Sequence, residues 1–396
     1  MRNIFKKVLQ IILNFNLKFL FNRSIRKIDN KITLFLIKYI SLFINFKTLN
    51  SKKASDNSEG IICFTLENLG DTIRASGVIN YLEKKHKPFF VCTEYNQKII
   101  ELLGIDANRI LVLKRDPGII DFINLLKFMK KYSFKRSVIL DHSNSKLFPL
   151  YCSKIANIEN VHWIDTNKIQ IKEIIDFSNV HNIDILTATK VFILKEFLEY
   201  DEFSTLTGEK LKYINLPCKK NPYNKYEDYI GIHIGGFGSL LYSVSRKYPE
   251  ENTYKLIFNL LNKGFKIVLT GDNLDTKFFE KYIKELSKFE NFQDLSGKLS
   301  IEELSFLLKS LKLYITSDNG TLHLAQAVGC KKIIAILGPT SPLLVKGVNT
   351  FILKEELWCS PCIKFIDFPK KCVHNKEICL LNLDYNKIIK LVEDLE

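Results

Sequence analysis

The sequence predicts an α/β protein made of two successive units, each with a parallel β-sheet covered by helices. From residue 58, short β-rich apolar runs alternate with amphipathic stretches of helical length, an order typical of parallel sheets. A polar, proline-containing stretch at 218–228 interrupts this alternation, which then resumes. A chain of 396 residues also suits two domains. We therefore expect domains at 58–217 and 229–382, a linker at 218–228 and a C-terminal helix at 383–396.

The first unit is predicted from four apolar runs and the helical stretches between them. After the first run comes a turn, then an amphipathic helix with Ile73, Val78 and Leu82 on one side. The segment DFINLLKFMKKY has the same character and predicts a helix at 121–132. The strand candidates are GIICFTL (60–66), PFFVCT (88–93), RILVL (109–113) and RSVILD (136–141).

The second unit repeats the pattern with clearer boundaries. Gly264 and Gly329 follow two of its helical stretches, where helices commonly end in left-handed backbone geometry. Its expected strands are 229–235, 265–271, 313–318 and 332–338. Its expected helices are 250–264, 275–288, 300–311 and 320–329.

The formal charge of +15 is concentrated at the N-terminus, which argues against a nucleic-acid-binding protein. Residues 1–53 hold twelve Lys or Arg and a single acid, Asp29, so +11 of the excess lies there. The rest of the chain is nearly balanced, and no nucleic-acid partner is expected.

The N-terminal segment 1–57 mixes Ile, Leu and Phe with Lys, Arg and Asn. Its longest nearly apolar stretch has fifteen residues and contains Lys38, whereas a membrane span needs about twenty. No small-residue cleavage site follows, so a secretory signal is not expected. The pattern favours a basic amphipathic helix on an anionic membrane surface; a helical extension packed on the body is the alternative.

The nine cysteines fall into two groups. Five lie in apolar surroundings and are expected to be buried, which favours a reducing compartment: Cys63, Cys92, Cys152, Cys218 and Cys330. Four form a C-terminal cluster: Cys359, Cys362, Cys372 and Cys379. The cluster's spacing is near that of zinc sites, although the final gap is wide. A structural metal and a disulfide both remain open.

Strand-to-helix turns are where parallel sheets bind ligands, because the following helix offers free N–H groups and a positive dipole end. In the first such turn, LENLGDT, Gly70 permits a tight turn and Asp71 stands at a helix start. Asp71 either caps that helix or offers its carboxylate to a ligand.

A glycine-rich turn follows the first strand of the second unit. Gly235 and Gly236 allow close backbone approach, and Arg246 with Lys247 supply positive charge. The spacing fits neither the dinucleotide fingerprint nor the P-loop. It suits an anionic group such as a diphosphate.

Two further turns carry polar residues. Asp272 and Asp275 either receive ribose hydroxyls or cap the next helix. In SDNGTLHLAQAVG, backbone N–H groups at a helix start form an anion site, and Asp318 can accept hydroxyl hydrogen bonds. His323 either packs or faces the same mouth. The helix start itself comprises Asn319, Gly320 and Thr321.

Taken in order over roughly residues 60–390, these segments resemble glycosyltransferase family 9, the ADP-heptose:lipopolysaccharide heptosyltransferases. The stretch from Asp294 to Pro342 is the most specific part, because DLSGK, DNGTLHLA and LGPTSP follow at the family's spacing. CSPC and the two later cysteines extend the likeness.

The resemblance implies a GT-B fold, with two Rossmann-like domains facing across a cleft. The N-terminal domain would hold the acceptor and the C-terminal domain the nucleotide sugar. It implies inverting transfer without metal or cofactor. By the family's motifs, Asp71 is the general base and Lys247 contacts the diphosphate. Asp275 contacts the ribose, and the helix-start motif maps onto Asp318, Asn319, Gly320, His323 and Leu324.

Four positions depart from the family's pattern. A basic residue is replaced by Thr65, which removes a cation expected near Asp71. The family's proline, tryptophan and threonine are replaced by Gly77, Tyr248 and Asn319. Tyrosine and asparagine can serve in packing and capping, so the fold is expected to hold.

The expected function is therefore sugar transfer from an ADP-heptose-like donor to a lipopolysaccharide or lipooligosaccharide core. A carboxylate would accept the acceptor's proton, and positive charge would stabilise the departing diphosphate. The enzyme is expected in the cytoplasm, peripheral on the inner membrane. The alternative is a GT-B nucleotide-sugar-binding protein with another donor, or with epimerase-like or degenerate activity.

Overall fold

The computed structural model describes residues 60–114, 119–132, 134–141, 147–163, 171–181, 183–195, 221–235, 245–364, 369 and 371–396. The chain divides into two compact units. Among the described residues, one unit comprises 60–163 with 189–195, and the other comprises 171–188 with 221–396. The predicted N-terminal segment 1–57 lies outside the described residues.

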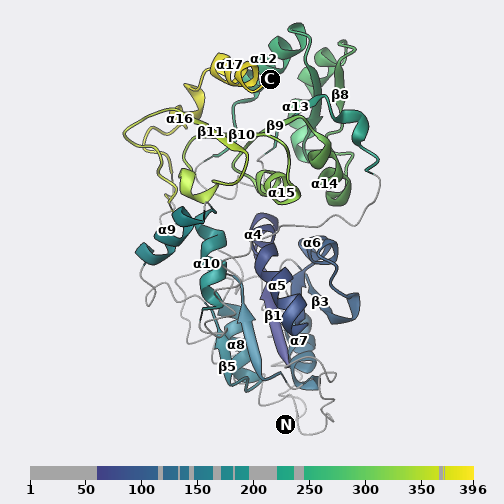
Figure 1. Ribbon diagram of the computed structural model, residues 1–396, viewed down its shortest axis with the longest axis vertical. Coiled ribbons are helices and arrows are strands. Elements are labelled where there is room, and N and C mark those ends of the chain that lie inside the picture. The colour runs from purple at the N-terminus through teal and green to yellow at the C-terminus, as the bar shows by residue number, and fades with distance from the viewer. Residues whose placement is uncertain are drawn as a thin grey trace, which may run out of the picture. The chain divides into compact units, whose positions relative to one another are not determined.

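The first unit contains a parallel sheet with strand order β3-β2-β1-β4-β5 in the described part of the chain (Figure 1). Central strand β1 is buried at every position, as expected of a strand with both faces covered. The four predicted strands are confirmed, and β5 is added. The bounds are β1 (Ile61–Thr65), β2 (Phe89–Thr93), β3 (Ile110–Leu113), β4 (Arg136–Ile139) and β5 (Asn160–His162).

Helices of the first unit follow its strands. The single helix expected after β1 is two helices, because α4 ends at Arg74 and α5 begins at Ser76. Ile73, Val78 and Leu82 are buried as predicted. The bounds are α4 (Leu69–Arg74), α5 (Ser76–His86), α6 (Gln97–Leu102), α7 (Ile119–Lys131) and α8 (Leu147–Ile155). Helix α10 (Ile185–Ile193) ends in this unit, and α9 (Ile171–Val180) belongs to the other.

The second unit has a parallel sheet with order β11-β10-β9-β6-β7-β8 among the described residues. Strands β9 and β10 are buried throughout. The four predicted strands are again confirmed, and the edge strands β8 and β11 are added. The bounds are β6 (Tyr229–His233), β7 (Lys266–Thr270), β8 (Phe292–Asp294), β9 (Leu313–Ser317), β10 (Ile333–Leu337) and β11 (Thr350–Lys354).

The helices of the second unit begin and end where the sequence indicates. Ser300 and Glu303 form a capping box at the start of α14. Gly264 and Gly329 have positive φ, 88° and 74°, after α12 and α15. The C-terminal helix α17 buries Ile388 and Val392 in the unit's core. The bounds are α12 (Glu250–Asn262), α13 (Asn273–Leu286), α14 (Ile301–Ser310), α15 (Gly320–Val328), α16 (Ile378–Leu381) and α17 (Tyr385–Asp394).

Each sheet has a switch point, where successive connections run to opposite sides. It lies between β1 and β4 in the first sheet and between β6 and β9 in the second. Ligands of parallel sheets bind beyond the carboxyl ends of strands at such points. The turns that carry Asp71, Gly235 and Asp318 follow β1, β6 and β9, so the fold places the predicted residues at its two switch points.

Candidate functional site

The turn after β1 holds Asp71 in the first turn of α4, not at its cap. The N-cap is Asn68, whose carbonyl accepts a hydrogen bond from the Asp71 N–H at 3.0 Å. The capping interpretation of Asp71 is therefore wrong. Its side chain is 14% exposed, so the carboxylate reaches the surface of the first unit.

Arg74 is the partner of Asp71 and was missed by the sequence argument. Its Nη1 atom donates to Asp71 Oδ1 at 3.0 Å across one helical turn. Thr65, which replaces the family's basic residue, instead shares a 2.9 Å hydrogen bond with Thr72. A cation therefore does lie beside Asp71, and the i, i+3 spacing was the available signal.

In the second unit, a chain of hydrogen bonds joins the start of α15 to the end of β6. Thr321 Oγ1 donates to Asn319 Oδ1 at 2.7 Å and accepts from the Tyr314 hydroxyl at 2.9 Å. Tyr314 in turn lies 3.4 Å from Thr270 Oγ1, which is 3.2 Å from His233 Nδ1. These hydrogen bonds connect the turn after β9 with the turn after β6, which the sequence predicted as two separate features.

His233 is a second residue that sequence reasoning missed. Burial lowers its pKa to about 4, with Asp272 opposing that shift and Lys247 adding to it, so the imidazole is neutral near pH 7. A neutral imidazole can donate one hydrogen bond and accept another. Its place at the end of a strand in IGIHIGG was the signal.

Gly235 lies directly against His233 and Asp275. A Cβ atom at position 235 would stand 2.2 Å from His233 Nε2 and 2.4 Å from Asp275 Oδ2. Glycine is thus required by these neighbours. Gly236 lies outside the described residues.

Asp275 takes part in a capping box at the start of α13. Its N–H donates to Asp272 Oδ1 at 2.8 Å, and its Oδ2 accepts from the Asp272 N–H at 3.0 Å. The capping alternative is confirmed for both acids. Asp275 is 2% exposed and lies beside the Gly235 turn.

The Asp318 carboxylate, in the β9–α15 turn, contacts several side chains. Its Oδ2 accepts from Arg246 Nη1 at 2.8 Å and from Thr340 Oγ1 at 2.7 Å. His323 Nε2 lies 3.8 Å from Asp318 Oδ1, and His323 is 4% exposed. His323 is thus both packed and directed at the turn. Thr340 was missed, although it stands in LGPTSP after the next strand, β10.

The helix start at α15 is already partly occupied by its own cap. Asn319 Oδ1 accepts from the N–H groups of Thr321 and Leu322 at 2.9 and 3.2 Å. The positive end of the helix dipole remains, and Gly320 is its first residue.

Lys247 lies in the segment that leads into α12. Its ammonium lies 2.9 Å from Glu250 Oε1, and its side chain is 14% exposed. Its charge acts on His233, whose pKa it helps to lower. Tyr248, in place of the family's tryptophan, packs in the core and donates to the Leu383 carbonyl at 2.7 Å.

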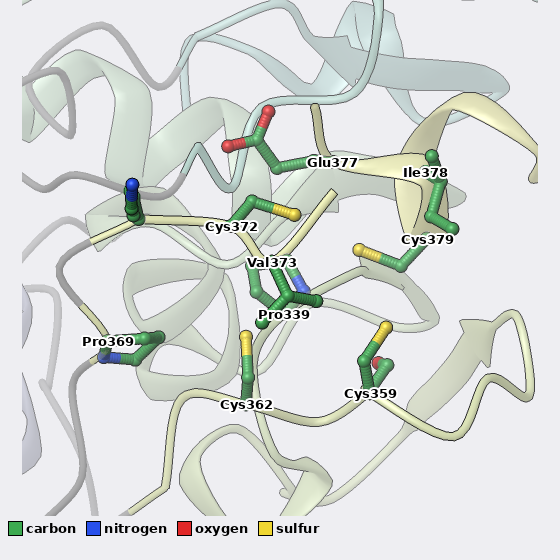
Figure 2. A pocket seen from close by; sticks show the side chains of 11 residues that line it. Pro339, Cys359, Cys362, Pro369, Cys372, Val373, Glu377, Ile378 and Cys379 are labelled. Atoms are coloured by element: carbon green, nitrogen blue, oxygen red, sulfur yellow. The ribbon is translucent and has the colours of Figure 1, made fainter. Parts of the chain in front are cut away.

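The four C-terminal cysteines line one small cavity (Figure 2). All four are free thiols. Burial raises the pKa of Cys379 to about 11, and the other three thiols of the cluster add to that shift. Among the described residues, no group of three or more His, Cys, Asp or Glu side chains has the geometry of a metal site.

The cysteines expected in apolar surroundings are buried where they are described. Cys63, Cys92, Cys152 and Cys330 are each at most 1% exposed. Cys218 lies outside the described residues. No helix in the described ranges combines the length and the apolar character needed to cross a bilayer.

Comparison with known proteins places these features in context. The model of glycosyltransferase family 9 (heptosyltransferase) matches residues 200–372. The chain is 27% identical over 361 residues to lipopolysaccharide heptosyltransferase 1 of Campylobacter coli, covering 85% of this chain and 98% of the relative. It is 23% identical over 353 residues to lipooligosaccharide heptosyltransferase 2 of Campylobacter jejuni, covering 83% and 95%.

Solved structures show the same fold. A glycosyltransferase family 9 protein of Veillonella parvula matches with a TM-score of 0.59 and 16% identity, covering 87% of this chain and 99% of that chain. The ADP-heptose lipopolysaccharide heptosyltransferase II of E. coli matches with a TM-score of 0.55 and 13% identity, covering 85% and 98%. These matches confirm the predicted GT-B fold class.

Proposed function

Since the chain belongs to glycosyltransferase family 9 and is a glycosyltransferase, we propose that it transfers a heptose or similar sugar from an ADP-heptose-like donor to a lipopolysaccharide or lipooligosaccharide core. The observation that carries the proposal is the match to a lipopolysaccharide heptosyltransferase over 98% of that relative's length. The polar residues gathered at the two switch points are in keeping with it.

In this proposal the second unit binds the nucleotide sugar. Lys247, with the positive end of α15, faces the diphosphate, and the Gly235 turn lets the ligand approach the backbone. Asp275, besides capping α13, contacts the ribose. Asp318 and His323 contact the donor sugar, and Arg246 holds the Asp318 carboxylate at 2.8 Å.

The first unit supplies the base for an inverting displacement. The Asp71 carboxylate accepts the proton of the acceptor hydroxyl while its oxygen bonds to the anomeric carbon. The bond from that carbon to the diphosphate oxygen breaks, and the nucleoside diphosphate carries away the electron pair. Arg74 orients the Asp71 carboxylate through its 3.0 Å hydrogen bond. Lys247 and the helix start stabilise the charge that develops on the diphosphate, so the protein itself provides what a metal would.

The D71N variant tests the role of Asp71. Because the amide cannot accept the proton, we expect kcat to fall about a hundred- to ten-thousand-fold, while the affinity for ADP measured by calorimetry stays unchanged. D106N is the matched control, since Asp106 caps a short helix on the surface of the same unit. Unchanged turnover in D71N would exclude Asp71 as the base.

Membrane association is proposed for the basic segment 1–57. Twelve basic residues in residues 1–53 favour an anionic lipid surface on the cytoplasmic face. Co-sedimentation of the full chain with phosphatidylglycerol vesicles, lost on substituting K6E and K7E or at high salt, is the expected result. Equal sedimentation with neutral vesicles would contradict it.

The cysteine cluster is proposed as a structural site, either a bound metal or a disulfide, that supports the segment around Pro339, whose carbonyl accepts the Cys362 N–H at 2.9 Å. Elemental analysis of protein purified with and without a reductant, beside the C362S variant, distinguishes the two. No metal and four titratable thiols under both conditions would remove both options.

A further inference from the structure

A buried charged cluster lies at the switch point of the first unit and takes no part in the chemistry above. Glu67 follows β1, Asp141 follows β4, and Lys190 comes from α10. Lys190 Nζ stands 3.3 Å from Glu67 Oε2, with the two side chains 1% and 4% exposed. The same ammonium donates to the carbonyl of Leu140.

Asp141 holds the backbone of the turn after β1. Its Oδ1 atom accepts the N–H groups of Leu66 and Glu67 at 2.8 and 3.2 Å. Its Oδ2 atom is buried without a hydrogen-bond partner among the described residues. Burial and the nearby Glu67 raise the pKa of Asp141 well above its ordinary range, and Lys190 opposes that shift. Lys190 is therefore the cation that this pair of acids shares.

Asn96 holds the same turn from the other side. Its amide donates to the carbonyls of Thr65 and Glu67 at 3.0 and 3.1 Å, and to Thr72 Oγ1 at 2.8 Å. Asn96 is fully buried. Three side chains from different parts of the sequence thus converge on the short turn Thr65–Glu67, which leads directly into the helix that carries Asp71.

Such a cluster is poorly explained as a device for stability alone. A buried ion pair can often be replaced by apolar residues at no loss of stability, whereas removing one partner leaves a costly buried charge. Its bonds here fix the direction of one turn, and a shift of about 1 Å in a reacting group can cost about a hundredfold in rate.

We infer that Lys190 is a positioning residue for the transfer reaction: through its ion pair with Glu67 it fixes the β1–α4 turn, so that Asp71 meets the acceptor hydroxyl. This rests on the proposed function, in which Asp71 is the base. Lys190 acts through the turn and touches no substrate.

Steady-state kinetics of K190M, K190R, E67Q and the double variant E67Q/K190M test the inference. We expect kcat to fall about ten- to a hundredfold in K190M and E67Q, with the donor KM and the ADP affinity within twofold of wild type. K190R keeps the charge and should recover most of kcat. The double variant should be no worse than either single variant, because the two residues act as one pair. K98M is the control, since Lys98 forms an exposed ion pair with Glu101 in the same unit.

Two results would overturn the inference. One is wild-type kcat in K190M or E67Q. The other is a loss of kcat matched by equal losses of ADP affinity and thermal stability, which would indicate a role in folding alone. If K190M does not fold, the question is decided by E67Q, which keeps the side-chain size, and by K190R, which keeps the charge. The D71N variant separates this test from the proposed function. An active D71N variant would exclude Asp71 as the base. An inactive D71N variant together with a fully active K190M variant would exclude only the positioning role of Lys190.

Discussion

At the scale of single residues, the sequence located the reactive groups better than their partners. Asp71, Asp318 and His323 could be singled out because polar residues at the ends of strands are conspicuous. Thr340 could not, because its contact with Asp318 depends on the path of the folded backbone. Arg74 was overlooked, although its i, i+3 spacing from Asp71 was a signal. Lys190 is the extreme case, since its partner Glu67 is 123 positions away in sequence.

The pKa of His233 is set by its folded environment, which no sequence motif encodes. Its folded pKa of about 4 lies below the ordinary value of 6.5. Between these pH values the unfolded chain binds more protons at His233 than the folded chain does. The contribution of His233 to the free energy of unfolding is therefore fully present above pH 6.5 and is lost as the pH falls through about 4. We expect H233Q to flatten the pH dependence of the free energy of unfolding across that window. NMR titration of the His233 ring gives the direct check, and a normal pKa there would contradict the account.

Among the elements, the apolar strands and the amphipathic helices were predictable, whereas the edge strands β5, β8 and β11 were not. β1, β9 and β10 are apolar along their length because both faces of the sheet are covered. β8 reads Phe-Gln-Asp, and β5 reads Asn-Val-His. Such segments become strands by pairing with a neighbour, so their local sequence carries little signal.

The break between α4 and α5 was also missed. Ile73 precedes and Val78 follows Ala75, where the first helix ends. A five-residue spacing turns a continuous helix by about 140°, so the two residues do not share one helical face, and this irregular spacing was the signal of the boundary.

Substitution of Gly235 tests how closely the end of β6 packs against its neighbours. In G235A the new methyl group would collide with His233 and Asp275, at 2.2 and 2.4 Å. We expect the end of β6 to shift and the ADP affinity measured by calorimetry to fall at least about tenfold, equivalent to roughly 1.4 kcal/mol.

G264A is the matched control for that variant. Gly264 has a φ of 88° and open space around its Cα, so alanine strains the backbone by about 1 kcal/mol far from the Gly235 turn. The G264A variant should melt earlier with unchanged ADP affinity. Equal ADP affinity in G235A and G264A would mean that the Gly235 turn is not part of the donor site.

At the scale of the whole molecule, the order of strands and helices fixed the class of fold. Two runs of alternating strands and helices predicted two parallel sheets, and both sheets are present with their switch points at the turns that bear the polar residues. The boundaries of the two units were harder to predict from the sequence. Helix α9 follows the strands of the first sheet along the chain and yet groups with the second unit. Such grouping depends on tertiary contacts that periodicity does not encode.

In the proposed function, this chain moves a sugar from a nucleotide to a glycolipid. The most direct measurement incubates the full-length protein with ADP-heptose and a lipooligosaccharide acceptor lacking heptose, followed by mass spectrometry of the lipid and quantification of released ADP. We predict one heptose added to the acceptor for each ADP released. Free heptose or an epimerised donor, with the lipid unchanged, would contradict the account.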